Sequence, residues 1–153
     1  MTGLEPGQLW VMRIHAAIVG AVVLTVAAGA NAVLAVALPV PMGAIVAPVA
    51  LLLVYPVLFG PTRRFAAWRY GADDQELRIR HGVVIQVQTV VPFGRVQHID
   101  VSQGPIERAF GVARLVLHTA GTANSQVVLP GLSRATAETL RDEIRVHIRQ
   151  DLM

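Results

Sequence analysis

Histidine and carboxylate side chains are the groups in this sequence that could transfer protons or hold a metal ion. No histidine is followed by a second one at a metal-binding interval, and no carboxylate recurs at a useful distance from them; the five are His15, His81, His98, His118 and His147. His98 and Asp100 fall on the same face of an alternating segment, where the carboxylate could orient the imidazole. No nucleophile accompanies them, so a surface pair is the favoured interpretation.

Other signatures of catalysis are missing from the sequence. It contains no cysteine, which excludes disulfides and thiolate metal sites. It also has neither a glycine-rich phosphate loop nor a Gly-x-Ser-x-Gly elbow. We therefore predict a protein that is not an enzyme, with no catalytic residue, no metal site, no cofactor and no small-molecule substrate.

The composition points to a membrane. Of the 153 residues, 54% are hydrophobic and 15% are charged, whereas about a quarter of the residues of a soluble domain are charged. All 13 basic residues are arginine, but the net charge is only +3 and no basic run is interleaved with aromatics. The sequence therefore gives no reason to expect a nucleic-acid partner.

Two uncharged stretches account for the hydrophobic excess. Residues 14–59 contain no Asp, Glu, Lys or Arg, and the apolar runs 14–38 and 42–59 are each long enough to cross a bilayer. Pro39-Val40-Pro41 cannot continue a helix, so the two runs are expected to form an antiparallel transmembrane hairpin. A cleaved signal peptide is the alternative for the first run, but that run is much longer than a signal peptide's apolar core.

Two polar residues inside the first run invite two interpretations. Asn31 and His15 could belong to a proton or ion path. Alternatively, Asn31 hydrogen-bonds across the hairpin and His15 reaches the headgroups. No carboxylate lies in either run, so the second interpretation is favoured.

Basic residues at the ends of the runs predict the orientation. They flank both runs while the connecting turn is uncharged, which places residues 1–13 and the C-terminal domain in the cytoplasm. Trp10 and Tyr55 fit interfacial aromatic positions. The candidates for contact with the bilayer interface and its lipid headgroups are Arg13, Arg63, Arg64, Trp68 and Arg69.

Residues 66–153 alternate like a small antiparallel sheet and end in a helix. The alternation predicts strands at 77–80, 83–91, 95–101, 112–119 and 126–129, with tight turns at His81-Gly82 and Pro130-Gly131. Residues 106–110 read as a short helical turn. Ser133 is a good N-cap for an amphipathic helix that runs to about Gln150. The fold class is therefore a membrane hairpin followed by an α+β domain.

Several segments of this domain together resemble a known family. They are 91–92 (Val-Pro), 95–99 (Arg-Val-Gln-His-Ile), 103–108 (Gln-Gly-Pro-Ile-Glu-Arg), 110–111 (Phe-Gly) and 119–121 (Thr-Ala-Gly). The combination is similar to the membrane-flanked bacterial pleckstrin-homology proteins (the bPH2, DUF304 or YdbS-like group). The resemblance implies a bacterial inner-membrane protein in which two transmembrane helices precede a PH-like split β-barrel of about seven antiparallel strands, capped by the C-terminal helix.

The residues that carry the resemblance have structural explanations. Gly111 is expected to end the helical turn with a positive φ, and Phe110 to pack that turn onto the sheet. Arg95 and Arg108 are expected to hydrogen-bond loop carbonyls or to pair with Asp100 or Glu107. We therefore assign Arg95, Gln97, Arg108, Phe110 and Gly111 to a structural motif.

Three functions remain open. The first is a membrane-anchored interaction or scaffold protein, an accessory subunit that binds another integral membrane protein or a second copy of itself. The second is recognition of anionic lipid headgroups, which the acidic stretch 71–76 disfavours because it would repel phosphate. A transport subunit is the weakest, since two uncharged helices cannot line a selective path alone.

Overall fold

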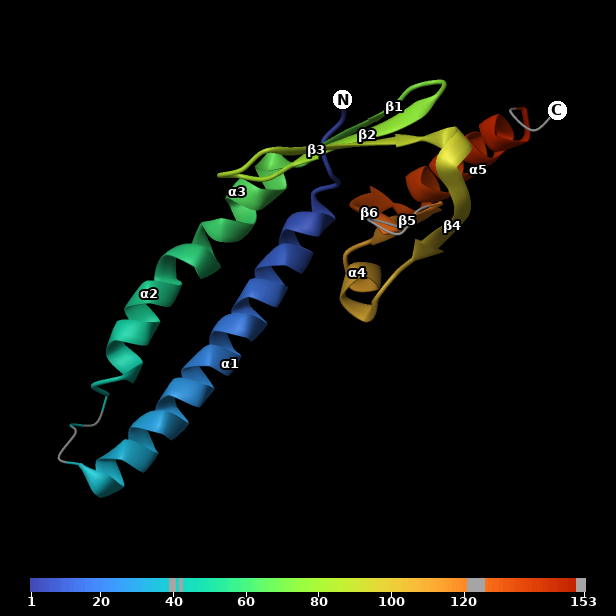
Figure 1. Cartoon of the computed structure of the whole chain (residues 1–153). Helices are drawn as coiled ribbons and strands as arrows, with labels where there is room; N and C mark the ends of the chain where they lie inside the picture. Colours follow the sequence, from blue (N-terminus) through green and yellow to red (C-terminus); the bar gives the residue numbers. More distant parts are fainter. Residues whose placement is uncertain (39–40, 42, 121–125, 151–153) are drawn as a thin grey trace. The chain divides into compact units, whose positions relative to one another are not determined.

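The computed structural model describes residues 1–38, 41, 43–120 and 126–150, and these form two compact units. One unit is Met12–Arg63, and the other combines Met1–Val11 with residues from Arg64 onward (Figure 1). Sequence reasoning treated residues 1–13 as a separate terminus and began the domain at residue 66. The structure instead adds the first residues of the chain to the C-terminal domain.

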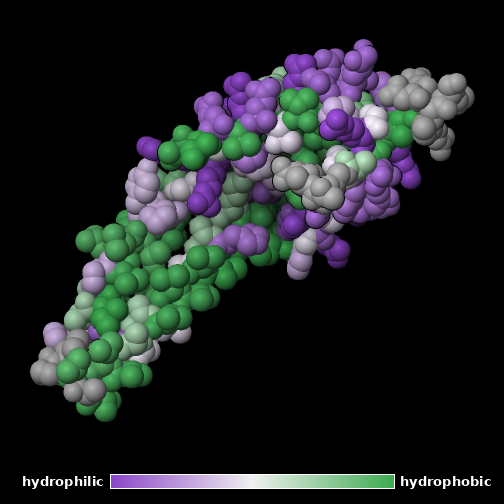
Figure 2. Space-filling view, in the orientation of Figure 1, coloured by the Kyte–Doolittle hydropathy of each residue, from purple (hydrophilic) through white to green (hydrophobic). Residues whose placement is uncertain are grey.

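The helices α1 (Gly7–Ala37), α2 (Val46–Leu58) and α3 (Gly60–Ala67) contain both apolar runs. Two helical stretches are long and apolar enough to cross a membrane, Gly7–Val36 and Val46–Ala67. No residue of α2 is buried, which is unlike the core helix of a soluble protein. Green, hydrophobic side chains dominate the surface of α1 and α2 in Figure 2.

The hairpin helices meet along small residues of α1. Gly20, Ala27 and Asn31 are buried at seven- and four-residue spacing, which places them on one face of the helix. A Cβ on Gly20 would lie 3.1 Å from Val57 of α2. Asn31 Oδ1 accepts a hydrogen bond from the backbone N–H of Ile45, at the start of α2, at 3.1 Å. The expectation that Asn31 hydrogen-bonds across the hairpin is therefore confirmed.

The domain contains two three-stranded antiparallel sheets. The first sheet is β1 (Arg69–Ala72), β2 (Glu76–His81) and β3 (Val87–Pro92), in that order. The second is β4 (Val96–Ser102), β5 (Val112–Thr119) and β6 (Gln126–Ser133). The described residues thus form six strands rather than about seven, and the arrangement is consistent with a PH-like fold.

The core lies under the second sheet and the C-terminal helix. Leu115 and Leu117 of β5 are fully buried, as the alternation predicts. Helix α5 (Arg134–Gln150) packs on β4, β5 and β6 through Ala137 and Ile144. Ser133 Oγ accepts the backbone N–H of Thr136 at 3.0 Å, which confirms the predicted N-cap.

Two predicted boundaries are wrong. Residues 83–86, assigned to a strand, form the turn between β2 and β3; Gly82 has φ +108° there, and a Cβ would collide with the carbonyl oxygen of Ile85. Pro130-Gly131, assigned to a turn, lies inside β6. The ladder with β5 shifts between Ala113 and Leu115, where Pro130 and Gly131 lie opposite the single residue Arg114. The one extra residue forms a bulge in which Gly131 has φ +70°.

The N-terminal segment, residues 1–11, fills the space that this bulge leaves. The backbone N–H of Glu5 donates to the carbonyl of Gly131 at 2.8 Å, and a Cβ on Gly131 would lie 2.7 Å from the side chain of Gln8. Thr2 and Tyr70 of β1 exchange two backbone hydrogen bonds of 2.7 and 2.9 Å. The domain is therefore completed by residues from both sides of the apolar hairpin.

Gly7 provides a test of this packing, because a Cβ there would collide with the carbonyl oxygen of Phe110. We expect Gly7→Ala to lower the free energy of unfolding of the domain by about 1–3 kcal/mol, the usual cost of overpacking. The matched control is Gly29→Ala, where a Cβ meets nothing within 4 Å and the better helix former should not destabilise. Equal thermal unfolding of both variants in detergent would contradict the packing of residues 1–11.

Candidate functional site

The basic residues proposed for the bilayer interface fall in both units. Arg13 and Arg63 belong to the unit 12–63, and the guanidinium of Arg63 lies 5.6 Å from the ring centre of Tyr55. Arg64 and Arg69, with Trp68 between α3 and β1, belong to the domain. The predicted residues therefore belong to two separate units, and Arg64, Trp68 and Arg69 share the domain.

In the domain, Trp68 and Arg69 lie against the end of β2. The indole of Trp68 stacks on the His81 ring with 4.6 Å between centres, and Arg69 Nη1 donates to the Trp68 carbonyl at 2.7 Å. Arg69 also lies directly opposite Arg80 in the antiparallel register. Two exposed like charges at paired positions repel each other. Sequence reasoning missed Arg80, because only the strand register brings it beside Arg69.

The opposite end of the same sheet is acidic. Asp73 and Asp74 form the turn between β1 and β2, and Glu76 at the start of β2 pairs with Arg78. Between the two ends, burial and then the charge of Glu5 raise the pKa of Tyr70. The first sheet therefore has a basic end, defined by Arg69 and Arg80, and an acidic end, defined by Asp73 and Asp74.

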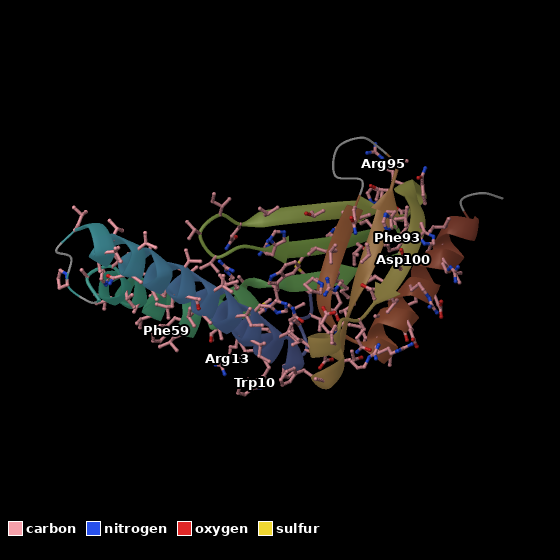
Figure 3. The ribbon with its side chains drawn as sticks, turned by 90° about the horizontal axis from the view of Figure 1, so that it is seen from below. Trp10, Arg13, Phe59, Phe93, Arg95 and Asp100 are labelled. Atoms are coloured by element: carbon pink, nitrogen blue, oxygen red, sulfur yellow. The ribbon has the colours of Figure 1, made fainter. Side chains whose placement is uncertain are left out.

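His98 and Asp100 do come together on β4, as alternation predicts. His98 Nε2 lies 2.8 Å from Asp100 Oδ1, and His118 Nε2 of β5 lies 3.4 Å from Asp100 Oδ2 (Figure 3 shows Asp100 on its strand). All three side chains are 40% exposed or more. No group of three or more His, Asp or Glu residues in the described part of the chain is placed to hold a metal ion. The cluster thus has the geometry of a surface ion pair with a second imidazole.

The family motif builds the short helix α4 (Pro105–Ala109) and its surroundings. Glu107 is its buried centre: Oε2 accepts the N–H of Gly104 at 2.7 Å, and both carboxylate oxygens contact Arg114 at 2.9–3.2 Å. The partner of Glu107 is therefore Arg114 and not the exposed Arg108, because the register of β5 places Arg114 beside the start of α4.

The other motif residues lie around this centre. Gly111 ends α4 with φ +67°, as expected. Phe110 stacks on Trp10 with 6.4 Å between ring centres, so it contacts the start of α1 and is not buried in the sheet. The carbonyl of Arg95 accepts the N–H of Ala120 at 2.9 Å. Gln97 is exposed at a register shift in β4.

A groove separates the two sheets at the edges of β3 and β6. Two adjoining cavities of about 260 and 200 Å³ lie there and share Thr89 and Val127. Ile79 and Val87 line the first cavity, and the second is lined by residues 89–92 with Arg95. Within the described residues, β3 and β6 each pair with a strand on one side only, so both edges of the groove have free backbone groups.

Comparison with known proteins agrees with this architecture. The bacterial PH domain family (bPH_2) matches residues 14–147, nearly the whole chain. The chain belongs to this family. It is 35% identical over 91 residues to the UPF0699 transmembrane protein YdbS of Bacillus subtilis, and 28% identical over 83 residues to the transmembrane protein YdbT of the same organism.

These matches cover 60% and 54% of this chain but only 55% of YdbS and 16% of YdbT. The chain therefore matches about half of YdbS and a smaller part of YdbT, and neither name states an activity. No solved structure matches the chain. The word "transmembrane" in both names agrees with the two apolar helices.

The Glu107–Arg114 pair yields a stability prediction. The side chain of Glu107 is 5% exposed, so Glu107→Gln leaves Arg114 without its charged partner and should cost about 1.5–3 kcal/mol. The matched control is Arg134→Gln, which breaks an exposed pair with Glu138 and should cost no more than about 0.5 kcal/mol. Urea unfolding of the full chain in mild detergent measures both, and equal losses would contradict the structural role of Glu107.

Proposed function

We propose that this chain is a non-enzymatic, membrane-anchored interaction protein, an accessory subunit that binds an extended segment of another integral membrane protein. The observation that carries the proposal is the groove between β3 and β6, where two open strand edges lie on either side of a channel lined by both apolar and polar groups. An added strand can satisfy such edges through backbone hydrogen bonds while alternate side chains enter the groove. Self-assembly through the same groove is the second form of this function.

The groove is suited to a peptide segment by its chemistry. Val87 and Val127 supply apolar walls, and Thr89 adds a hydroxyl between them. Each backbone hydrogen bond contributes only about 0.5–1.5 kcal/mol net, so several residues of an extended segment are needed for useful affinity. A small compact ligand would leave most of the free edge groups unused.

The membrane anchor supports a partner in the same membrane. Residues 1–11 and the chain from residue 64 onward form one folded unit, so a hairpin that crosses the bilayer between them must cross it an even number of times. Both ends then lie on one side, and the positive-inside rule applied to Arg13, Arg63 and Arg64 assigns that side to the cytoplasm. We place the protein in the bacterial inner membrane with its PH-like domain cytoplasmic.

Photo-crosslinking in native membranes tests the groove. A photoreactive amino acid at Thr89 of the full chain should give one defined higher-mass adduct, whereas the same residue at Val146, exposed on α5, should not. Val127→Glu places a charge in the groove and should abolish the Thr89 adduct, and Val146→Glu should leave it intact. Circular dichroism confirms that each variant is folded.

The identity of the adduct decides between the two forms. An integral membrane protein linked through consecutive residues of one segment supports the accessory subunit, and a second copy of this chain supports self-assembly. No adduct at Thr89, or equal adducts at Thr89 and Val146, would contradict the proposal.

The basic end of the first sheet favours a second candidate, the binding of anionic headgroups. Arg69 and Arg80 lie at paired positions of the register, and no carboxylate from the described residues forms an ion pair with either of them. A lipid phosphate would relieve their repulsion. The acidic residues Asp73 and Asp74, which argue against headgroup binding on sequence alone, lie at the other end of the sheet. Attraction of each arginine to an anionic surface is worth about 1 kcal/mol.

Arg80→Gln should therefore change the stability of the full chain in opposite directions in two lipids. In phosphatidylcholine vesicles, loss of the cross-strand repulsion should raise the free energy of unfolding by about 0.2–1 kcal/mol. In phosphatidylglycerol vesicles the variant should instead be less stable by about 1 kcal/mol, an effect that high salt removes. Arg145→Gln on α5 is the control of equal charge. The same sign in both lipids would exclude headgroup binding at this pair.

A further inference from the structure

The turn between β2 and β3 presents three consecutive apolar side chains to its surroundings. Val84 is 95% exposed, Ile85 is 77% exposed and Val83 is 43% exposed. Isolated exposed apolar residues are ordinary, but a contiguous group at the tip of a hairpin marks an interaction surface. We call residues 83–85 the apolar tip.

The backbone of the turn holds these side chains outward. Gly82 has φ +108°, and a Cβ there would collide with the carbonyl oxygen of Ile85, so no other residue fits. The chain therefore folds back immediately after β2 and resumes pairing at Val87, opposite His81. The apolar tip projects beyond the last paired residues, where no described part of the domain covers it.

The register places the apolar tip at one defined end of the first sheet. Arg69, where β1 begins, lies opposite Arg80, two residues before Gly82. The chain reaches Arg69 directly from α3, the end of the second long apolar helical stretch. The tip thus lies at the end of the sheet where the chain arrives from the apolar hairpin.

The acidic end of the sheet lies farthest from the apolar tip. Asp73 and Asp74 share a cavity with Glu143 and His147 of α5, and Figure 1 shows this turn and the β2–β3 turn at opposite ends of the sheet. Charge and hydrophobicity are therefore sorted along the first sheet. The apolar tip comes first, then the Trp68–His81 stack, then the Arg69–Arg80 pair, and the carboxylates of the β1–β2 turn come last.

We propose that the apolar tip inserts into the headgroup–acyl boundary of the bilayer that the hairpin crosses. The order of side chains matches a bilayer surface: aliphatic groups enter the acyl region, while the indole and the guanidinium groups lie at headgroup level. The occupant of this surface is lipid. The inference rests on the proposed membrane insertion of the hairpin, but it does not depend on what binds the groove.

Single-cysteine labelling tests the insertion, because the natural chain contains no cysteine. Val84→Cys, and separately Ile85→Cys, in the full chain carry an environment-sensitive NBD fluorophore in vesicles of phosphatidylethanolamine and phosphatidylglycerol. Val146→Cys, an exposed valine on α5, is the matched control. At positions 84 and 85 we expect blue-shifted emission, loss of fluorescence with nitroxide-labelled lipids, and protection from aqueous iodide. At position 146 we expect the reverse.

Two outcomes overturn the proposal. Iodide quenching of both tip probes, with no quenching by nitroxide lipid, would show that the tip is in water. Protection from both quenchers would show that protein covers the tip, such as a second copy. In either case, an unchanged Thr89 adduct would leave the groove proposal intact, and carbonate-resistant membrane association of the same samples would show that the hairpin itself is inserted.

Discussion

The packing of residues 1–11 against the bulge at Gly131 is the constraint on which the rest of the structure depends. Glu5 donates to the carbonyl of Gly131, and Gln8 and Leu4 occupy the space where a side chain at that position would lie. Because the partners are separated by the whole apolar hairpin, both ends of the hairpin belong to the same folded domain. A membrane that the hairpin crosses must therefore be crossed an even number of times, whatever charges lie at the ends of the hairpin. It also makes the first turn of α1 part of the domain core.

The local parts of this structure were predictable from sequence and the nonlocal parts were not. The inward Leu115 and Leu117 predicted β5, and Ser133 predicted the start of α5, because both signals lie within a few residues. The bulge at Gly131 was read as a turn, since Pro-Gly is typical of turns and nothing local reveals the N-terminal segment that fills it. The predicted turn at His81-Gly82 is in the right place but too short, because the β-branched residues 83–85 that belong to it have the composition of a strand.

The candidate sites also combine local features that the sequence predicts with nonlocal features that it does not. Alternation placed His98 and Asp100 on one face, but the contribution of His118 follows from the pairing of β4 with β5, which composition does not encode. Likewise, only the pairing of β1 with β2 brings Arg80 beside Arg69. Sequence also counted the acidic stretch 71–76 against headgroup binding. That argument applies to the turn between β1 and β2, and the antiparallel register places this turn at the opposite end of the sheet from Arg69 and Arg80.

Placement at a membrane changes what the groove between β3 and β6 must achieve. In solution, a segment that adds a strand would lose much of its binding free energy to ordering and to translational entropy. A segment that leaves the same membrane within a few residues of its own helix is already confined near the domain, so its effective concentration is on the order of millimolar. A small number of backbone hydrogen bonds is then sufficient to hold the segment in the groove. An apolar tip seated in the bilayer would add to this effect, because it restricts the rotation of the first sheet and so keeps the edge of β3 available to neighbouring membrane proteins.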